Sequence, residues 1–353
     1  MIVTVTLNPA LDVTYRLDAL TLDATNRVAE VACRAGGKGV NVARLLHGLS
    51  GGPATAGGLP GGPEGGDGAF PEEFGGSEVV AVGLAGGTAG TAFLADLDEA
   101  GLAYAFVPCA AETRRTVAVV DSGAATVTML NEPGPVVTPA EWQALCHRLE
   151  GLLPEATVVV LSGSLPPGLP PDAYATLVRQ AERHGVPAVL DADGGALLAA
   201  LSAGPEIVKP NISELARALT ARHGAPGSGE PAGPPDAAGG AAWMRQEGAR
   251  AVVVSDGPRG LYADTPDGRW RAVPPEVRGG NPTGAGDAAV AALALGLALG
   301  WDWPRTLVRA AALSAAAVRH PLAGQIDPAV YLDHVGRVRL ERARSESEDS
   351  QCR

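Results

Sequence analysis

The chain has 353 residues, of which 46% are hydrophobic and 19% are charged, and its formal net charge is −12. This length is enough to bury a large core, either as one domain or as one domain with a lid. The negative charge argues against nucleic acid or an anionic membrane as the main partner. An anionic substrate would therefore need a local basic site.

The cysteines are few and far apart, at Cys33, Cys109, Cys146 and Cys352. This spacing favours neither a zinc site nor a disulfide framework, so we expect reduced thiols. The chain starts with a strand-like run and has no basic leader, and no apolar run is long and unbroken enough to predict a membrane span. These features predict a cytoplasmic protein without a membrane partner.

Short β-branched runs alternate along the chain with helical patterns. In chain order, the predicted strands are Ile2–Leu7, Val79–Gly83, Thr157–Ser162, Ala188–Asp191, Glu206–Lys209 and Ala251–Ser255. The predicted helices between and around them are Lys38–Leu49, Gly90–Ala100, Pro139–Leu153, Pro171–His184 and Ala237–Glu247. Uniformly apolar strands interleaved with helices indicate an α/β fold with a doubly wound, mainly parallel sheet that is covered on both faces.

Polar residues stand at the carboxyl ends of several predicted strands. They are Asn8, Ser162–Ser164, Asp191, Lys209 and Ser255. In open α/β sheets, ligands bind beyond these strand ends. We therefore expect a binding site along this edge of the sheet.

Other segments alternate apolar with polar residues, which is typical of strands with one wet face. They are Asp12–Ala19, Arg27–Arg34, Tyr104–Cys109 and Arg115–Asn131. We interpret residues 12–35 and 104–131 as a small β-sheet that stands off the core as a lid.

Two segments rich in Gly, Pro and Ala interrupt the pattern, at residues 50–77 and 224–240. Neither carries enough apolar surface to offset the entropy cost of ordering, so we predict flexible insertions. The charged tail at 341–353 is expected to fray. The remainder, residues 1–340, is predicted to form a single domain.

The run Asn281–Asp287 reads Asn-Pro-Thr-Gly-Ala-Gly-Asp and precedes a small-residue apolar helix. A glycine-rich turn at a helix N-terminus leaves backbone N–H groups that can hold an anion. Asp287 places a carboxylate beside them, as phosphoryl transfer to a hydroxyl group requires. Taken alone, the segment would favour a simpler interpretation, an acidic N-cap after a flexible loop.

Four further segments accompany this turn. They are Asn8–Asp12, the Gly-Gly-Lys-Gly-Val-Asn run Gly36–Asn41, Lys209–Leu215, and the Ser-Asp-Gly-Pro-Arg-Gly run Ser255–Gly260. Together and in this order, they resemble the PfkB (ribokinase-like) carbohydrate kinase family. Thr6–Asp12, Asn131–Pro135 and Ser162–Gly168 are similar to its phosphosugar branch, which holds 1-phosphofructokinase, tagatose-6-phosphate kinase and the minor 6-phosphofructokinase.

The resemblance implies roles for residues that match the family's motifs. Asp287 would be the general base, and the amides of Gly284, Ala285 and Gly286 would stabilise the transferring phosphoryl group. The implied sugar-binding residues are Asp12, Gly37 and Asn41, and the candidates for a substrate phosphate are Lys38, Arg27 and Arg114. The implied ATP-binding residues are Lys209, Asn211, Ser255, Asp256, Gly257, Gly260 and Gly286. Asn211 and Glu214 would hold Mg²⁺ through water.

Two segments depart from the family's pattern. Asp191-Ala192-Asp193-Gly194-Gly195 stands where the family has Asp-Ser/Thr-Ser-Gly-Glu, and Asp256 replaces the leucine of a Ser-Leu-Gly turn. Neither change removes the proposed base or the anion-binding turn. Both changes leave open which sugar is the substrate.

The resemblance therefore implies an ATP- and Mg²⁺-dependent kinase that phosphorylates a hexose phosphate. Fructose 1-phosphate is the first candidate, followed by tagatose 6-phosphate and fructose 6-phosphate, with an unphosphorylated sugar or a nucleoside as further alternatives. The family's lid sheets often pair between subunits, which implies a homodimer.

Two hypotheses of other classes compete. A non-catalytic sugar- or nucleotide-binding regulator would be favoured by loss of Asp287 or its glycine turn, but both are present. An NAD-dependent oxidoreductase is disfavoured because Asn8–Asp12, and not a Gly-x-Gly-x-x-Gly run, follows the first strand.

Overall fold

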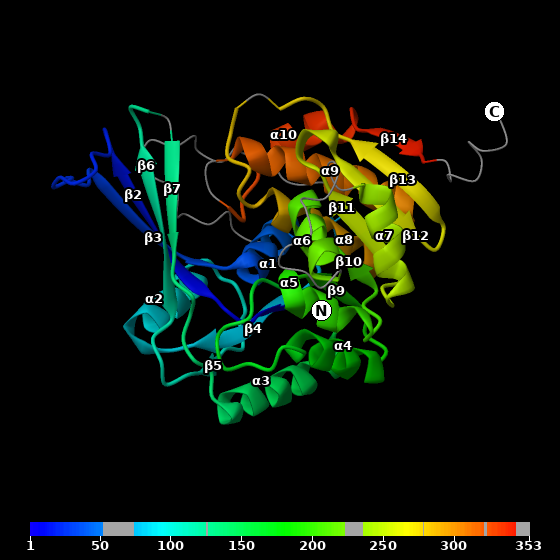
Figure 1. The fold of residues 1–353 in the computed structure, drawn as a ribbon, viewed down its shortest axis with the longest axis horizontal. Coiled ribbons are helices and arrows are strands. Elements are labelled where there is room, and N and C mark those ends of the chain that lie inside the picture. The colour runs from blue at the N-terminus through cyan, green and yellow to red at the C-terminus, as the bar shows by residue number, and fades with distance from the viewer. Residues whose placement is uncertain (52–73, 125, 223–235, 278, 321–322, 344–353) are drawn as a thin grey trace.

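A computed structural model describes residues 1–51, 74–124, 126–222, 236–277, 279–320 and 323–343. Its main feature is a ten-stranded sheet with the order β14-β13-β12-β11-β10-β9-β8-β1-β4-β5 (Figure 1). The strands are β1 (Ile2–Thr6), β4 (Val79–Ala85), β5 (Val107–Pro108), β8 (Val158–Ser162), β9 (Ala188–Asp191), β10 (Ile207–Val208), β11 (Ala251–Ser255), β12 (Leu261–Thr265), β13 (Gly268–Val273) and β14 (Arg339–Arg342).

The pairing from β5 through β11 is parallel, and β11 to β14 add antiparallel strands at the other edge. Every residue of β1, β4, β8 and β9 is buried, as expected for strands that are covered on both faces. The predicted doubly wound, mainly parallel α/β fold is confirmed.

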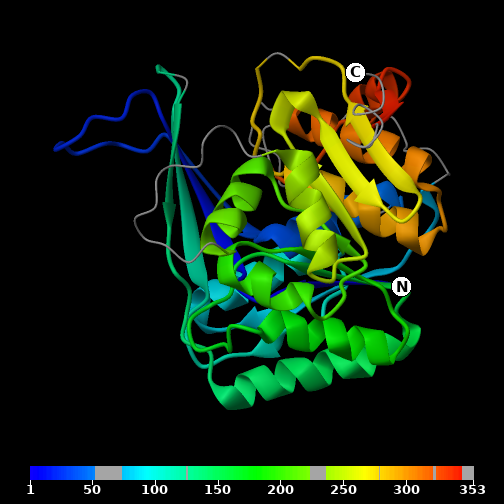
Figure 2. The same cartoon turned by 45° about the vertical axis from the view of Figure 1, so that its right-hand side comes forward.

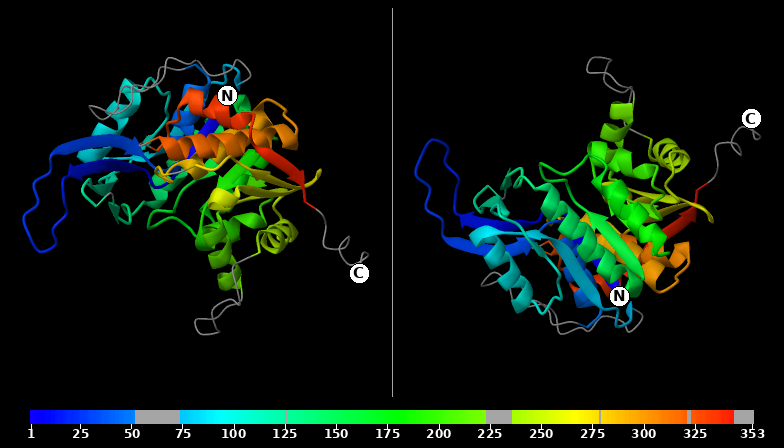
Figure 3. Two further views of the ribbon diagram at one scale, coloured as in Figure 1. Left: turned by 90° about the horizontal axis from the view of Figure 1, so that it is seen from above. Right: turned by 90° about the horizontal axis from the view of Figure 1, so that it is seen from below.

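Two helical layers enclose this sheet, one on each face (Figure 3). One layer consists of α1 (Lys38–Leu49), α2 (Gly87–Glu99), α8 (Ala285–Ala298), α9 (Trp303–Arg319) and α10 (Pro328–Val335). The other consists of α3 (Pro139–Leu152), α4 (Ala173–Arg183), α5 (Gly194–Leu201), α6 (Ile212–Arg222) and α7 (Ala237–Gln246). Alternate residues of one strand serve the two cores: Val158 and Val160 join the first, Val159 and Leu161 the second.

A separate four-stranded sheet stands beside the main body (Figures 1 and 2). Its order is β3-β2-β6-β7, formed by β2 (Ala10–Leu17), β3 (Glu30–Gly36), β6 (Arg114–Asp121) and β7 (Thr126–Asn131). We call these strands the lid sheet. The prediction that residues 104–109 belong to it is wrong, because Tyr104 bridges to Ala81 and β5 pairs with β4 at the edge of the main sheet.

The predicted insertions fall largely outside the described residues. At the end of the first, however, Phe74 is fully buried, and its ring lies 5.4 Å from that of Tyr331. At the end of the second, Asp236 caps α7 by accepting hydrogen bonds from Ala238 and Gly239, so residues 237–240 are helical. The predicted tail also starts too early, since residues 341 and 342 belong to β14.

Among the described residues, no helix combines the length and the apolar character needed to cross a bilayer.

Candidate active site

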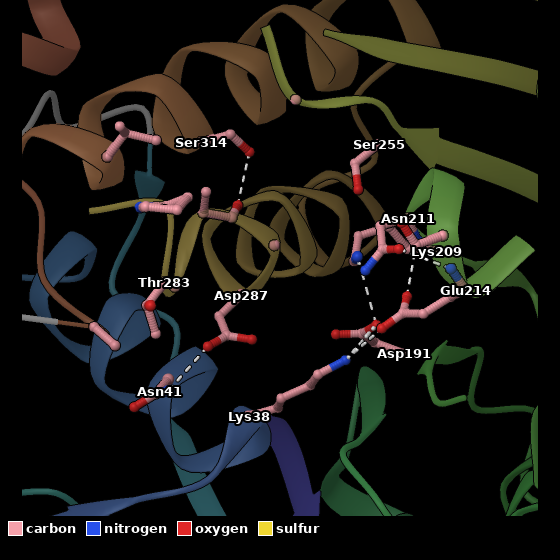
Figure 4. A pocket seen from close by; sticks show the side chains of 18 of the residues that line it. Lys38, Asn41, Asp191, Lys209, Asn211, Glu214, Ser255, Thr283, Asp287 and Ser314 are labelled. Atoms are coloured by element: carbon pink, nitrogen blue, oxygen red, sulfur yellow. Dashed lines mark hydrogen bonds and ion pairs between the residues drawn. The ribbon is translucent and has the colours of Figure 1, made fainter. Parts of the chain in front are cut away.

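A cavity of about 1140 Å³ lies between the lid sheet and the carboxyl ends of the main-sheet strands. The lid sheet contributes Asp12, Arg114, Thr116, Met129 and Asn131 to its walls. The strand ends contribute Ser164, Asp191, Lys209 and Ser255. The first turn of α8 and part of α9 complete it (Figure 4). The site therefore occupies the edge that the sequence predicts.

The turn before α8 depends on Gly284, whose φ of 89° lies in the left-handed region. A Cβ atom there would also lie 3.0 Å from the Cα atom of Ala323, so only glycine fits without strain. No side chain caps α8. The Ala285 amide donates to the Pro282 carbonyl at 3.2 Å, and Gly286 and Asp287 continue the cavity wall. From α9, the Ser314 hydroxyl donates to the Ala285 carbonyl at 2.8 Å.

Asp287 is buried in the first turn of α8 and faces α1 (Figure 4). The Asn41 side-chain amide donates to its Oδ2 atom at 2.9 Å. Burial raises the pKa of Asp287 to about 6, and the nearby charge of Asp191 acts in the same direction. The Asn41 hydrogen bond and the cations of Lys38 and Lys209 oppose that rise in pKa. The result is a carboxylate that is charged at neutral pH but more basic than an exposed one.

Two lysines and two acids form a charged network next to Asp287. The Lys38 ammonium lies 3.3 Å from Asp191 Oδ1 and 3.2 Å from Glu214 Oε1. Lys209 lies 3.4 Å from the same Asp191 oxygen. Burial favours neutral Lys38, but the charges of Asp191 and Glu214 outweigh it and raise the lysine's pKa. Burial likewise favours neutral Asp191, but the two lysines hold its pKa below the usual value.

Asn211 and Glu214 lock the start of α6 in a reciprocal pair. The Asn211 amide N–H donates to Glu214 Oε2, and the Glu214 amide N–H donates to Asn211 Oδ1, both at 2.8 Å. This is the geometry of a capping box. Both Glu214 oxygens thus have a protein partner, Lys38 for one and the Asn211 amide for the other. Each keeps a second lone pair, so the carboxylate fits a hydrated Mg²⁺ held through water better than a bare ion.

Asp12 and Arg114 mark the end of the cavity below the lid sheet. Burial raises the pKa of Asp12 to about 6, opposed by Arg114, a Thr116 hydrogen bond and Arg34. Arg114 donates to the carbonyls of Asn8, at 3.3 Å, and Glu132, at 3.0 Å. These two contacts use Nε and Nη1, and the guanidinium carries a further nitrogen. A buried carboxylate that can accept hydrogen bonds thus lies near a guanidinium that can donate to an anion.

Residues 5–329 match the family model of the pfkB family carbohydrate kinases. The chain belongs to this family. It is therefore a carbohydrate kinase, an enzyme that transfers a phosphoryl group to an alcohol.

Solved structures of other kinases agree with this assignment. Phosphofructokinase-2 from Escherichia coli, in complex with fructose 6-phosphate, is 27% identical, with a TM-score of 0.78 over 95% of this chain and 98% of its own. A possible 1-phosphofructokinase from Thermotoga maritima is 25% identical, with a TM-score of 0.76 over 98% and 100%. Ribokinase from Thermotoga maritima, at 16% identity and a TM-score of 0.68 over 94% and 99%, shows the shared fold alone.

The kinase cavity brings together most of the residues predicted from sequence. Those that line it are Asp12, Gly37, Lys38, Asn41, Arg114, Lys209, Asn211, Glu214, Ser255, Gly257, Gly260, Gly284, Ala285, Gly286 and Asp287. Lys38, a candidate for the substrate phosphate, is paired with Asp191 and Glu214 in this structure.

Two predicted residues are not in the lining. Arg27 is exposed in the connection between β2 and β3 and does not reach the cavity of this chain. Asp256 pairs with Arg259 at 2.7 Å and also stays outside the cavity lining.

The sequence placed Ser164 and Asp191 at the binding edge, because both stand at strand ends where ligands gather, but it gave neither a specific role. It did not indicate Arg217 and Ser314, which also line the kinase cavity. Arg217 and Ser314 lie inside helices, where the sequence shows no sign of which face meets the cavity.

Proposed function

We propose that this kinase transfers the γ-phosphoryl group of ATP to a hydroxyl of a hexose phosphate. Fructose 1-phosphate, giving fructose 1,6-bisphosphate, is the first candidate. The observation that carries the proposal is the presence of Arg114 beside Asp12 at the lid end of the cavity that contains Asp287. A sugar that accepts a phosphoryl group at Asp287 can then keep its existing phosphate near Arg114.

In the proposed reaction, the sugar hydroxyl oxygen attacks the γ-phosphorus and the bond to the ADP oxygen breaks. The hydroxyl proton passes to the Asp287 carboxylate, whose pKa of about 6 suits a general base at neutral pH. Asn41 orients that carboxylate through its hydrogen bond. Charge on the transferring group would be stabilised by the α8 turn that Gly284 shapes. The Gly286 amide would donate to the γ-phosphate, and the Ala285 amide would share its donation with the Pro282 carbonyl.

We assign the nucleotide to the other end of the cavity. Lys209, Asn211 and Ser255 lie there, and Gly257 and Gly260 allow close approach to the main chain. Asp12, Gly37 and Asn41 would contact the sugar. Mg²⁺ would neutralise phosphate charge, held through water by Glu214 and Asn211.

Fructose 6-phosphate is the second candidate, because the similar Escherichia coli phosphofructokinase-2 has been solved in complex with it. Tagatose 6-phosphate, an unphosphorylated sugar and a nucleoside stay as alternatives. A regulator without catalytic activity is disfavoured because Asp287 and the α8 turn stand together in one cavity. We further propose a cytoplasmic homodimer that pairs through the lid sheets, which carry exposed Val31, Val127 and Leu130.

The test is an ADP-release assay over a panel of hexoses, hexose phosphates and nucleosides. Arg114→Ala should raise KM for the preferred sugar phosphate by about 10²-fold, the loss of one charge-assisted contact of about 2–3 kcal/mol. KM for ATP should change little. Arg115→Ala is the matched control, since Arg115 is adjacent, half-exposed and outside the cavity lining. Efficient turnover of free hexoses, unaffected by Arg114→Ala, would contradict the phosphosugar assignment.

A further inference from the structure

The charge of the cavity poses a problem for a nucleotide. Among the described residues, its charged lining comprises four cations, Lys38, Arg114, Lys209 and Arg217, and five carboxylates, Asp12, Asp191, Glu214, Glu276 and Asp287. The described lining therefore has no excess of positive charge, although a nucleoside triphosphate and a sugar phosphate are both polyanions. Within the part of the chain that the structure describes, the lining cations that can turn toward phosphate belong to this set.

Three of the four cations already have partners within the site. Lys38 and Lys209 share the buried carboxylate of Asp191. Because that carboxylate is withdrawn from water, taking either lysine away from it is costly. Arg114 donates to two main-chain carbonyls beneath the lid sheet, at the end that we assign to the sugar.

Arg217 differs from the other three. It lies on α6 four residues after Ser213, and both residues are exposed and line the cavity. Residues with this spacing share one helical face, so Arg217 extends the wall formed by the first turn of α6. Its guanidinium is paired at 2.6 Å with Asp193, and the two side chains are 56% and 40% exposed. Such exposed pairs contribute only about 0–1 kcal/mol, so this one can be exchanged at little cost.

We propose that Arg217 binds the phosphate chain of the nucleotide, leaving Asp193 for the phosphates when the nucleotide enters. Asp193 does not line the cavity, so it holds the guanidinium at the rim in the free enzyme. A planar guanidinium can donate two parallel hydrogen bonds to a phosphate, which makes the exchange favourable. This inference rests on ATP as the phosphoryl donor, as proposed above.

The experiment measures nucleotide binding to the whole enzyme by calorimetry, without sugar and with Mg²⁺ present. For Arg217→Ala, the Kd for ATP and for ADP should rise about tenfold, since a charge-assisted contact is lost and a weak surface pair no longer has to be broken. Adenosine has no phosphate, so its Kd should stay unchanged. In turnover, KM for ATP should rise while KM for the sugar does not. Arg337→Ala is the control, because Arg337 also forms an exposed 2.6 Å pair, with Asp333 on α10, and lies outside the cavity lining.

A second variant tests the role of Asp193 as the competing partner. The Asp193 Oδ1 atom also caps α5 by accepting from the Gly194 amide at 2.7 Å, and asparagine keeps this cap. Asp193→Asn should lower the Kd for ATP by about threefold, because the ion pair that competes for Arg217 is gone. In the Arg217→Ala background the same change should lower the Kd by less, because there is no guanidinium left to release.

The outcomes separate the two proposals. An unchanged Kd for ATP in Arg217→Ala, or an equal loss of adenosine binding, would overturn the role of Arg217 and leave the kinase assignment intact. A wild-type enzyme that binds no ATP would overturn the proposed donor and this inference with it.

Discussion

Burial, more than any single neighbour, determines the chemistry of Asp287. The carboxylate lies in the first turn of a helix whose following residues are fully buried, and this environment raises its pKa from 3.8 to about 6. A general base works best when its pKa approaches the working pH while it stays ionised. Gly286, the residue before it, has no side chain, and a Cβ atom there would lie 3.5 Å from the Lys209 Nζ atom.

Replacing Asp287 by asparagine should abolish turnover, because an amide cannot take the hydroxyl proton. We expect kcat to fall by about 10²–10⁴-fold, while KM for ATP and for the sugar stays within a few-fold. A coupled ADP-release assay checks this. A variant that keeps more than about a tenth of the wild-type kcat would mean that another group is the base.

The raised pKa of Asp287 also predicts how activity and stability depend on pH. In the wild type, kcat should be constant above the pKa of about 6 and fall as the pH drops through it. The free energy of unfolding should change in the opposite direction, because Asp287 binds its proton more tightly in the folded state than in the unfolded chain. The stabilising contribution of Asp287 is therefore present below pH 3.8 and is lost as the pH rises through about 6. Asp287→Asn should therefore have a higher Tm than the wild type at neutral pH and an equal Tm in acid. Thermal melts across this range test it, and equal Tm values at neutral pH would contradict the assigned burial cost.

Glu214 should connect the metal to the lysine network. Glu214→Gln keeps an oxygen for the Asn211 amide but removes the charge that faces Lys38. We expect a higher Mg²⁺ concentration for half-maximal activity and a lower kcat, because one carboxylate commonly anchors a hydrated Mg²⁺. Titrating activity against free Mg²⁺ measures both. An unchanged curve with normal kcat would place the metal elsewhere.

At the scale of an element, α1 contains one glycine that its packing requires and one that it does not. The helix begins directly against β1, which positions Lys38 and Asn41 in the cavity. A Cβ atom at Gly39 would lie 2.4 Å from the Thr6 hydroxyl and 2.8 Å from the Val5 carbonyl. Gly48, in the last turn of the same helix, has open space around it.

The two glycines should therefore respond to alanine with opposite signs. Gly39→Ala pushes α1 away from β1 and should lower the free energy of unfolding by about 1–3 kcal/mol, with a loss of kcat. Gly48→Ala should raise it by about 0.5–1 kcal/mol, since alanine favours the helix. Urea titrations of both variants give the comparison. A stable, active Gly39→Ala enzyme would show that α1 can shift without disturbing the site.

At the scale of the whole molecule, the lid sheet is the feature with the least internal support. Every residue of β7 whose burial is described is exposed, and Val127 is 56% accessible. Isolated sheets with exposed apolar residues are stabilised when they pair with another surface. A second copy of the chain is the partner that we propose.

Light scattering should accordingly give twice the mass of the 35.6 kDa chain. Val127→Asp should shift the protein toward the monomer, because it places a charge in the proposed apolar contact. Leu332→Asp on α10 should leave the mass unchanged, although Leu332 is 47% exposed. If all three proteins have the mass of a dimer, the dimer contact lies outside the lid sheet. If the wild type has the mass of a monomer, the proposed dimer is wrong.

Several features were predictable because they depend on local chemistry. The α8 turn needs glycine for its left-handed φ, and Asp287 follows it in the first helical turn, so both are visible as a motif. Strand ends such as Asp191 and Lys209 were predictable because parallel strands present their carboxyl ends at one edge. Alternating polarity revealed β2, β3, β6 and β7, but it assigned residues 104–109 to the wrong sheet. The reason is that β5, a short strand at the edge of the main sheet, also has one buried and one exposed residue.

The sequence by itself determined the fold class, the family and the residues of the anion-binding turn, because each follows from periodicity or from contiguous motifs. Only the tertiary structure decided which charges meet. Lys38 pairs with Asp191 and Glu214, Asp256 pairs with Arg259, and Arg217 reaches the cavity from the middle of a helix. Ion pairing and burial act through space between residues far apart in the chain, so no local pattern records them.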